Sequence, residues 1–169
     1  MIQVYTGDGK GKTTAAIGLA LRASGAGLKV YIGQFIKGKS YSELKALKKI
    51  PNIKIEQYGS GCFIKDKPKQ VDIDLVRKGL KRVRQILVKR NYDLIILDEI
   101  NVALFLGLLK VSEITNLIKA APKKIEIILT GRWAHPKVIR LANLVSEIKD
   151  IKHYYKRGIK ARKGISCGT

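Results

Sequence analysis

The fold of this chain is decided by the stretch Thr6-Gly7-Asp8-Gly9-Lys10-Gly11-Lys12-Thr13-Thr14. It follows the apolar run Ile2-Gln3-Val4-Tyr5 and leads into a small-residue, apolar segment of helical character. A strand, a glycine loop and a helix in this order form a phosphate-binding loop. Glycines let consecutive backbone N–H groups turn inward at the positive end of a helix. We expect Lys12 to add a mobile positive charge for phosphates and Thr13 to offer its hydroxyl to Mg²⁺.

The spacing of this loop is unusual. The common pattern is a glycine, four residues and then Gly-Lys-Ser/Thr. Here only three residues separate Gly7 from Gly11, so Thr6 stands where the first glycine is expected. The loop is therefore either one residue short or begins without a glycine.

Length and composition predict one globular domain over residues 1–169, with 46% hydrophobic residues and few prolines. Cys62 and Cys167 lie far apart and form no C-x-x-C pair, which indicates neither a zinc site nor a disulfide framework. The strand and loop begin at once, leaving no room for a signal peptide, and no apolar run approaches the roughly 18 residues of a membrane span. We expect a cytoplasmic protein that is not bound to membranes.

The net charge of +21 is the second notable feature. Positive charge at this density attracts nucleic acid, anionic lipid or a polyphosphate substrate. A lysine-rich, solvated surface is the favoured explanation. Only three Phe and one Trp are present, and no nucleic-acid recognition motif is found, so nucleic acid is not the expected partner.

Apolar runs alternate with helical patterns, which predicts an α/β fold with a mainly parallel sheet and helices on both faces. The expected strands are Ile2–Tyr5, Lys29–Ile36, Ile53–Tyr58, Tyr92–Leu97, Ile125–Thr130 and Leu144–Ile148. The expected helices are Lys12–Ser24, Ser42–Lys49, Val71–Lys89, Val111–Ala120 and Pro136–Ala142. Open sheets of this kind bind ligands at the carboxyl ends of their strands.

Two further segments place polar residues at that edge. The run Leu94-Ile95-Ile96-Leu97 ends in Asp98 and Glu99, carboxylates of the kind that hold Mg²⁺ in phosphate-loop enzymes. The next strand ends in Thr130-Gly131-Arg132, and the guanidinium of Arg132 suits a phosphate. No Ser-His-Asp arrangement is discernible, which favours a protein that positions substrates.

These motifs together resemble the phosphate-loop ATP:corrinoid adenosyltransferases, also called cob(I)alamin adenosyltransferases. The resemblance extends over nearly the whole chain and rests on the short loop, Gln34-Phe35-Ile36-Lys37-Gly38, Leu97-Asp98-Glu99, Thr130-Gly131-Arg132, Gly158-Ile159-Lys160-Ala161 and Gly164-Ile165. It implies a RecA-like phosphate-loop fold. It also implies transfer of the 5′-deoxyadenosyl group of ATP to the cobalt of a reduced corrinoid, with release of triphosphate.

The resemblance assigns roles to individual residues. It implies that ATP binds in a reversed sense, which gives the short loop a rationale. It implies that Lys12, Thr13 and Glu99 are catalytic, and that Thr13, Asp98 and Glu99 serve Mg²⁺ or Mn²⁺. The implied residues for nucleotide and corrinoid binding are Gly7, Asp8, Gly9, Lys10, Gly11, Lys12, Thr13, Thr14, Gln34, Lys37, Arg132 and Phe63.

Other implications concern the corrinoid and protein partners. An aromatic pair in the segment matching Gly59–Ile64 displaces the lower cobalt ligand in well-known members, and Phe63 is the single aromatic residue there. The resemblance further implies a homodimer and a flavoprotein reductase. Two other function classes stay open at this point. A phosphate-loop ATPase or small-molecule kinase would release ADP, and a basic nucleic-acid-binding module would be retained on DNA in a salt-dependent way.

Overall fold

The computed structural model describes residues 1–61 and 67–165. Six strands in this part of the chain form one sheet in which every pairing is parallel, with the order β3-β2-β4-β5-β1-β6. The strands are β1 (Ile2–Thr6), β2 (Val30–Phe35), β3 (Ile53–Tyr58), β4 (Leu94–Asp98), β5 (Glu126–Thr130) and β6 (Leu144–Glu147). The predicted α/β class is confirmed.

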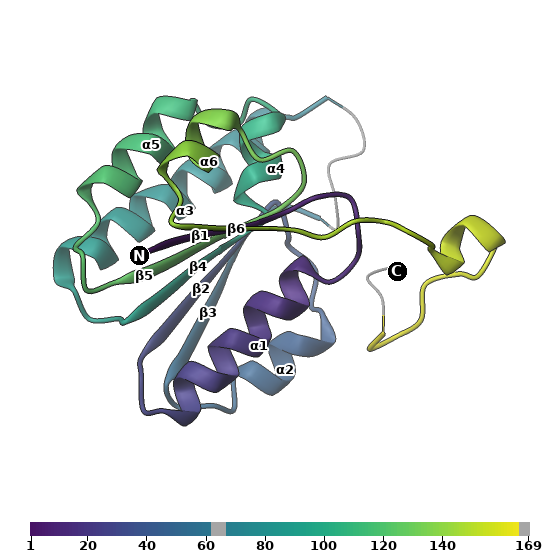
Figure 1. Cartoon of the computed structure of the whole chain (residues 1–169), viewed down its shortest axis with the longest axis horizontal. Coiled ribbons are helices and arrows are strands. Elements are labelled where there is room, and N and C mark those ends of the chain that lie inside the picture. The colour runs from purple at the N-terminus through teal and green to yellow at the C-terminus, as the bar shows by residue number, and fades with distance from the viewer. Residues whose placement is uncertain (62–66, 166–169) are drawn as a thin grey trace.

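Helices cover both faces of the sheet. They are α1 (Lys12–Gly25), α2 (Ser42–Leu47), α3 (Gln70–Lys89), α4 (Ile100–Phe105), α5 (Val111–Ala120) and α6 (Pro136–Leu141), followed by the 3₁₀ helix η1 (Tyr154–Arg157). Helices α1 and α2 lie on one face and α3 to α6 on the other (Figure 1). The chain first steps from β1 toward the β3 edge and then back toward β6. Because parallel crossovers are right-handed, this reversal moves the later helices to the opposite face.

Strand β4 shows why the central strands are continuously apolar. Leu94 and Ile96 pack on the α1 side, whereas Ile95 and Leu97 pack on the α3 side. Both faces of the strand are therefore buried, as expected for a covered parallel sheet. Each such side chain contributes roughly 1.5–3 kcal/mol when fully buried. Strand β6 differs, since all four of its residues are exposed at the edge of the sheet.

The predicted elements agree with the structure to within about two residues at most ends. Helices α4 and η1 were not predicted from the sequence. Helix α4 is short, almost wholly apolar, and begins directly after a strand. Its sequence therefore shows no alternation of apolar and polar residues that would predict a helix. None of the described helices has the length and apolar character that a membrane-spanning segment needs.

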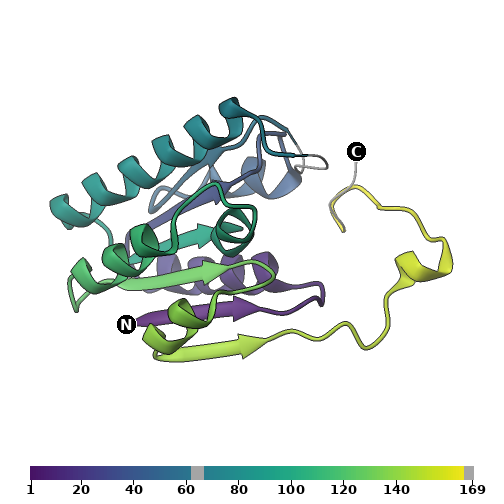
Figure 2. The ribbon, with the colours of Figure 1, turned by 90° about the horizontal axis from the view of Figure 1, so that it is seen from above.

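The parallel sheet brings the carboxyl ends of all its strands to one edge. The phosphate-loop segment, the ends of β2 and β4, and the turn after β5 meet there. Strand β5 lies between β1 and β4, so the loop and the Asp98-Glu99 pair are separated by one strand. In Figure 2 the yellow segment after β6 extends past this edge. The described tail thus lies on the side where a ligand is expected.

Candidate nucleotide site

The lysine of the phosphate loop is hydrogen-bonded to the backbone of the loop itself. The Nζ atom of Lys12 donates hydrogen bonds to the carbonyl oxygens of Gly7 and Gly9, both at 2.6 Å. The side chain is only 8% exposed, so it is less mobile than the sequence suggested. Burial lowers the pKa of this ammonium, while the neighbouring charge of Glu99 acts in the opposite direction.

The segment after β6 packs directly behind the loop. The backbone N–H of Gly9 donates to the carbonyl oxygen of Ile148 at 2.7 Å. A Cβ atom on Gly9 would lie 2.6 Å from the carbonyl oxygen of Lys149, so no other residue fits there without a shift. The expectation that all three glycine N–H groups turn toward phosphate is therefore wrong for Gly9. Its N–H instead anchors the loop to the segment after β6, because it donates to the carbonyl oxygen of Ile148.

Asp98 is the centre of the buried part of the site. It ends β4, is 1% exposed, and accepts hydrogen bonds from four side chains. Oδ1 accepts from the hydroxyls of Thr13 at 2.8 Å and Thr130 at 2.7 Å. Oδ2 accepts from Lys37 at 2.7 Å and Gln34 at 3.2 Å. The motifs predicted from sequence thus meet at one carboxylate.

Thr130 is a residue that sequence reasoning left without a role. Its hydroxyl donates to Asp98 and accepts the backbone N–H of Glu99 at 3.1 Å. Glu99 adopts a left-handed conformation, with φ of 61°, at the start of α4. A non-glycine residue rarely takes this conformation, and such residues cluster at functional sites. The hydrogen bond from its backbone fixes where the Glu99 side chain begins.

Lys37 reaches the same centre from the end of β2. Strands β2 and β4 are neighbours, and their register pairs Gln34 with Asp98. The preceding residue, Ile36, has a φ of 53°, which turns the chain at this point. The loop then packs against the segment after β3, where a Cβ on Gly38 would overlap the carbonyl oxygen of Gly59. These contacts place a lysine where only 2% of it is exposed.

The two carboxylates of the site have opposite electrostatic surroundings. Burial by itself raises the pKa of Asp98, but the ammonium of Lys37 and the hydrogen bonds from Lys37 and the two threonines outweigh it and lower that pKa. Burial, followed by the negative charge of Asp98, raises the pKa of Glu99. Asp98 therefore stays ionised while Glu99 takes up a proton more readily than an ordinary carboxylate.

Arg132 lies on the outer side of the loop. Its Nη2 donates to the carbonyl oxygen of Asp8 at 3.2 Å, and its Nε lies 3.8 Å from Asp8 Oδ1. The turn that carries it is tied to β1, because the N–H of Ala134 donates to the hydroxyl of Thr6 at 3.3 Å. Asp8 and Arg132 are both more than half exposed.

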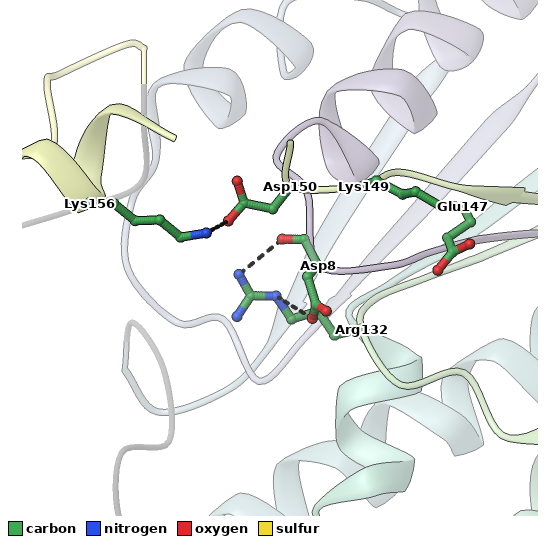
Figure 3. Close-up of a pocket in the computed structure, with 6 residues that line it drawn as sticks. All are labelled: Asp8, Arg132, Glu147, Lys149, Asp150 and Lys156. Carbon is green, nitrogen blue, oxygen red and sulfur yellow. Dashed lines mark hydrogen bonds and ion pairs between the residues drawn. The ribbon is translucent and has the colours of Figure 1, made fainter. Parts of the chain in front are cut away.

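A cavity of about 490 Å³ opens beside this pair. Figure 3 shows Arg132 and Asp8 facing one another while Asp150 and Lys156 approach from the tail. The ammonium of Lys156 lies 2.8 Å from Asp150 Oδ2. The lining residues are Asp8, Arg132, Glu147, Lys149, Asp150 and Lys156. Sequence reasoning missed the last four.

Three further predicted residues are Lys10, Thr14 and Phe63. Lys10 and Thr14 belong to the loop and are exposed. Phe63 lies outside the described residues. Among the residues that the structure describes, no cluster of three or more His, Cys, Asp or Glu side chains offers a preformed metal cage. The oxygens of Thr13, Asp98 and Glu99 nevertheless suit Mg²⁺, which takes few protein ligands and completes its shell with water and phosphate.

Fold and site together define a phosphate-loop nucleotide-binding protein of the RecA-like type. Sequence comparison goes further. The profile of the family described as ATP:corrinoid adenosyltransferase BtuR/CobO/CobP matches residues 1–167. The chain belongs to this family of enzymes.

Individual relatives agree with this assignment. A corrinoid adenosyltransferase of Pseudomonas aeruginosa is 36% identical over 167 residues, covering 98% of this chain and 82% of that protein. One from Escherichia coli is 33% identical over 165 residues, covering 98% of this chain and 84% of its own length.

Solved structures support the fold alone. A KaiC-like protein of Pyrococcus horikoshii has a TM-score of 0.52 at 17% identity, over 86% of this chain and 71% of the other. The cytoplasmic part of the secretion ATPase EccC of Thermomonospora curvata has a TM-score of 0.59 at 14% identity, over 86% of this chain and 20% of that one.

Proposed function

We propose that this protein transfers the 5′-deoxyadenosyl group of ATP to the cobalt of a reduced corrinoid and releases triphosphate. The observation that carries the proposal is the junction of the phosphate loop with Asp98, through the 2.8 Å hydrogen bond from Thr13, in a chain of this family. ATP and a corrinoid are the family's substrates.

The nucleophile in this reaction is the substrate itself. The reduced cobalt supplies both electrons of the new cobalt–carbon bond, the C5′–O5′ bond breaks, and its electron pair leaves on the triphosphate. No protein base is needed. In agreement, the Nδ1 atoms of His135 and His153 each accept a nearby backbone N–H, from Lys137 and Tyr155, and so act as caps. The protein's task is alignment and stabilisation of the leaving charge.

We assign the leaving triphosphate to Lys12 and to the loop backbone from Gly7 to Thr14, apart from the N–H of Gly9, which donates to Ile148. Arg132 and Lys37 add positive charge at the two sides of the loop, and Gln34 orients Asp98. Thr13, Asp98 and Glu99 are the proposed holders of Mg²⁺ or Mn²⁺. The bound ion would neutralise part of the triphosphate charge.

The further proposals concern the setting of the enzyme. We propose one domain over residues 1–169, a homodimer, and a cytoplasmic enzyme that receives its corrinoid reduced by a flavoprotein. Phe63 is proposed to face the corrinoid. Gly59 and Ser60 begin the segment that leads to it, and the hydroxyl of Ser60 donates to Asp72 at 2.7 Å, which ties that segment to the start of α3.

Anaerobic incubation with ATP, Mg²⁺ and chemically reduced cobalamin tests the function. The expected result is a light-sensitive cobalt–carbon product, detected by its absorption before and after illumination. Lys12→Ala, which removes the lysine of the phosphate loop, should lose most of this activity. Lys45→Ala, which removes an exposed lysine on α2, is its matched control and should keep full activity. Absence of the light-sensitive product with the wild-type protein would refute the proposal.

A further inference from the structure

Lys37 stands among the residues proposed to hold the divalent ion. Its ammonium lies 2.7 Å from Asp98 Oδ2, 3.3 Å from the hydroxyl of Thr13 and 3.9 Å from Glu99 Oε1. All three proposed ligands thus have the same lysine nitrogen as a close neighbour. A P-loop site already contains one lysine for the phosphates, here Lys12, so a second one in this place needs its own explanation.

The backbone holds Lys37 in this position. The left-handed Ile36 precedes it, and the N–H of the following Gly38 donates to the carbonyl oxygen of Gly61 at 2.6 Å. The ring of Tyr41 lies beside the ammonium, with its centroid 5.9 Å away. A buried ammonium is stable only with opposite charge nearby, and Asp98 and Glu99 provide it.

A divalent ion bound by Thr13 and Asp98 would lie within a few Å of this ammonium. Two cations at such a distance repel each other strongly in a buried site. Lys37 has a flexible four-carbon side chain, so its ammonium can move to a new anionic partner. The phosphates of a nucleotide are the partner that arrives together with the metal.

We propose that Lys37 is a resident cation of the metal site. Its ammonium pairs with the carboxylates in the free enzyme and disfavours binding of a bare divalent ion. When the metal enters as its triphosphate complex, the ammonium turns from Asp98 to a phosphate oxygen. The metal and the triphosphate therefore bind as one unit. This inference rests on the proposed function only in taking a metal-bound triphosphate group as the ligand.

Electron paramagnetic resonance of Mn²⁺ tests the proposal on the full chain without any corrinoid. Wild-type protein should bind Mn²⁺ weakly alone and much more tightly when inorganic triphosphate is present. Lys37→Met should bind Mn²⁺ alone at least about tenfold more tightly than the wild type, since one repelling charge is gone. Lys37→Arg keeps the charge and should resemble the wild type.

Lys39→Met is the matched control, because the same change is made at an exposed lysine two positions away. It should leave Mn²⁺ binding unchanged. In EDTA, Lys37→Met should lose about tenfold in affinity for inorganic triphosphate, measured by calorimetry, whereas Lys39→Met should lose little.

Tight binding of Mn²⁺ to the wild type without triphosphate would overturn the proposal, and this measurement needs no variant to fold. Equal Mn²⁺ affinities of Lys37→Met and the wild type would overturn it as well. Neither readout depends on adenosyl transfer, so failure of this inference and failure of the proposed function are distinguishable.

Discussion

Two charged regions contact the same phosphate loop and differ in solvent exposure and in the distance between their charged atoms. In the inner one, Lys37 and Asp98 are 2% and 1% exposed and their charged atoms lie 2.7 Å apart. In the outer one, Arg132 and Asp8 are 52% and 72% exposed and their charged atoms lie 3.8 Å apart. The inner carboxylate accepts four side-chain hydrogen bonds, whereas the outer pair faces an open cavity.

The difference separates two tasks. The inner region is buried and its groups are held by hydrogen bonds, so electrostatic interactions there are strong. The outer region is screened by water and salt, so its ion pairs contribute little and can rearrange around a ligand. We therefore expect substitutions in the inner region to have the larger effects.

The largest expected effect is on stability. Asp98→Asn removes the negative partner of the buried Lys37 ammonium and should lower the free energy of unfolding by about 3 kcal/mol. Urea unfolding measures this change, with Asp74→Asn on exposed α3 surface as a control expected to change little. An Asp98→Asn variant as stable as the control would show that the inner pair is not a strong structural contact.

Next in size is the loss of activity in Lys12→Ala. This substitution removes the only ammonium that donates to the loop carbonyls of Gly7 and Gly9 within the described residues. The rate of adenosylation should fall at least about 100-fold, as when a positioned donor to a developing negative charge is removed. Stopped assays at saturating ATP measure it, and circular dichroism checks the fold. Turnover close to that of the wild type would contradict the role given to Lys12.

The third prediction concerns pH. The metal site proposed here needs the ionised form of Glu99, whose pKa is raised, whereas the lowered pKa of Asp98 keeps that group ionised. As pH falls from about 7 toward the raised pKa of Glu99, which lies above the ordinary range of a glutamate, affinity for the Mg²⁺–triphosphate complex should therefore decline with protonation of Glu99. Calorimetry of the wild type and Glu99→Gln measures this decline. The variant should bind more weakly at pH 7 and show a shallower decline, because only protonation of the triphosphate itself remains. The same slope in both proteins would exclude Glu99 as a source of the decline.

The smallest effect is expected at the outer region. Arg132→Ala should weaken ATP binding by no more than about fivefold, because exposed ion pairs are worth up to roughly 1 kcal/mol. The loss should shrink further at high salt. Calorimetry at low and high ionic strength measures both changes. A loss of two orders of magnitude that ignores salt would place Arg132 with the inner region.

Much of the fold could be predicted from the sequence because its core strands are apolar and its helices periodic. Strand β4 is an example, since a strand that is buried on both faces is a continuous run of apolar residues in the sequence. Helix α4 could not be predicted, because six mostly apolar residues after a strand carry no helical period. The exposure of β6 could not be predicted either, since its position at the edge of the sheet depends on the strand order.

The site could be predicted residue by residue but not as an arrangement. The motifs pointed to Thr13, Asp98 and Arg132, and the parallel sheet to their common edge. The pairing of Lys37 with Asp98 depends on β2 lying next to β4, which no local pattern encodes. The support that Ile148 gives to Gly9 likewise depends on β6 lying beside β1.

The phosphate loop, with the inner region beside it, is proposed to hold triphosphate as a leaving group. Phosphorus nuclear magnetic resonance of the products, after anaerobic reaction with ATP, Mg²⁺ and reduced cobalamin, tests it most directly. We predict inorganic triphosphate in equal amount to the cobalt–carbon product. ADP with inorganic phosphate or a phosphorylated acceptor, in place of triphosphate, would contradict it.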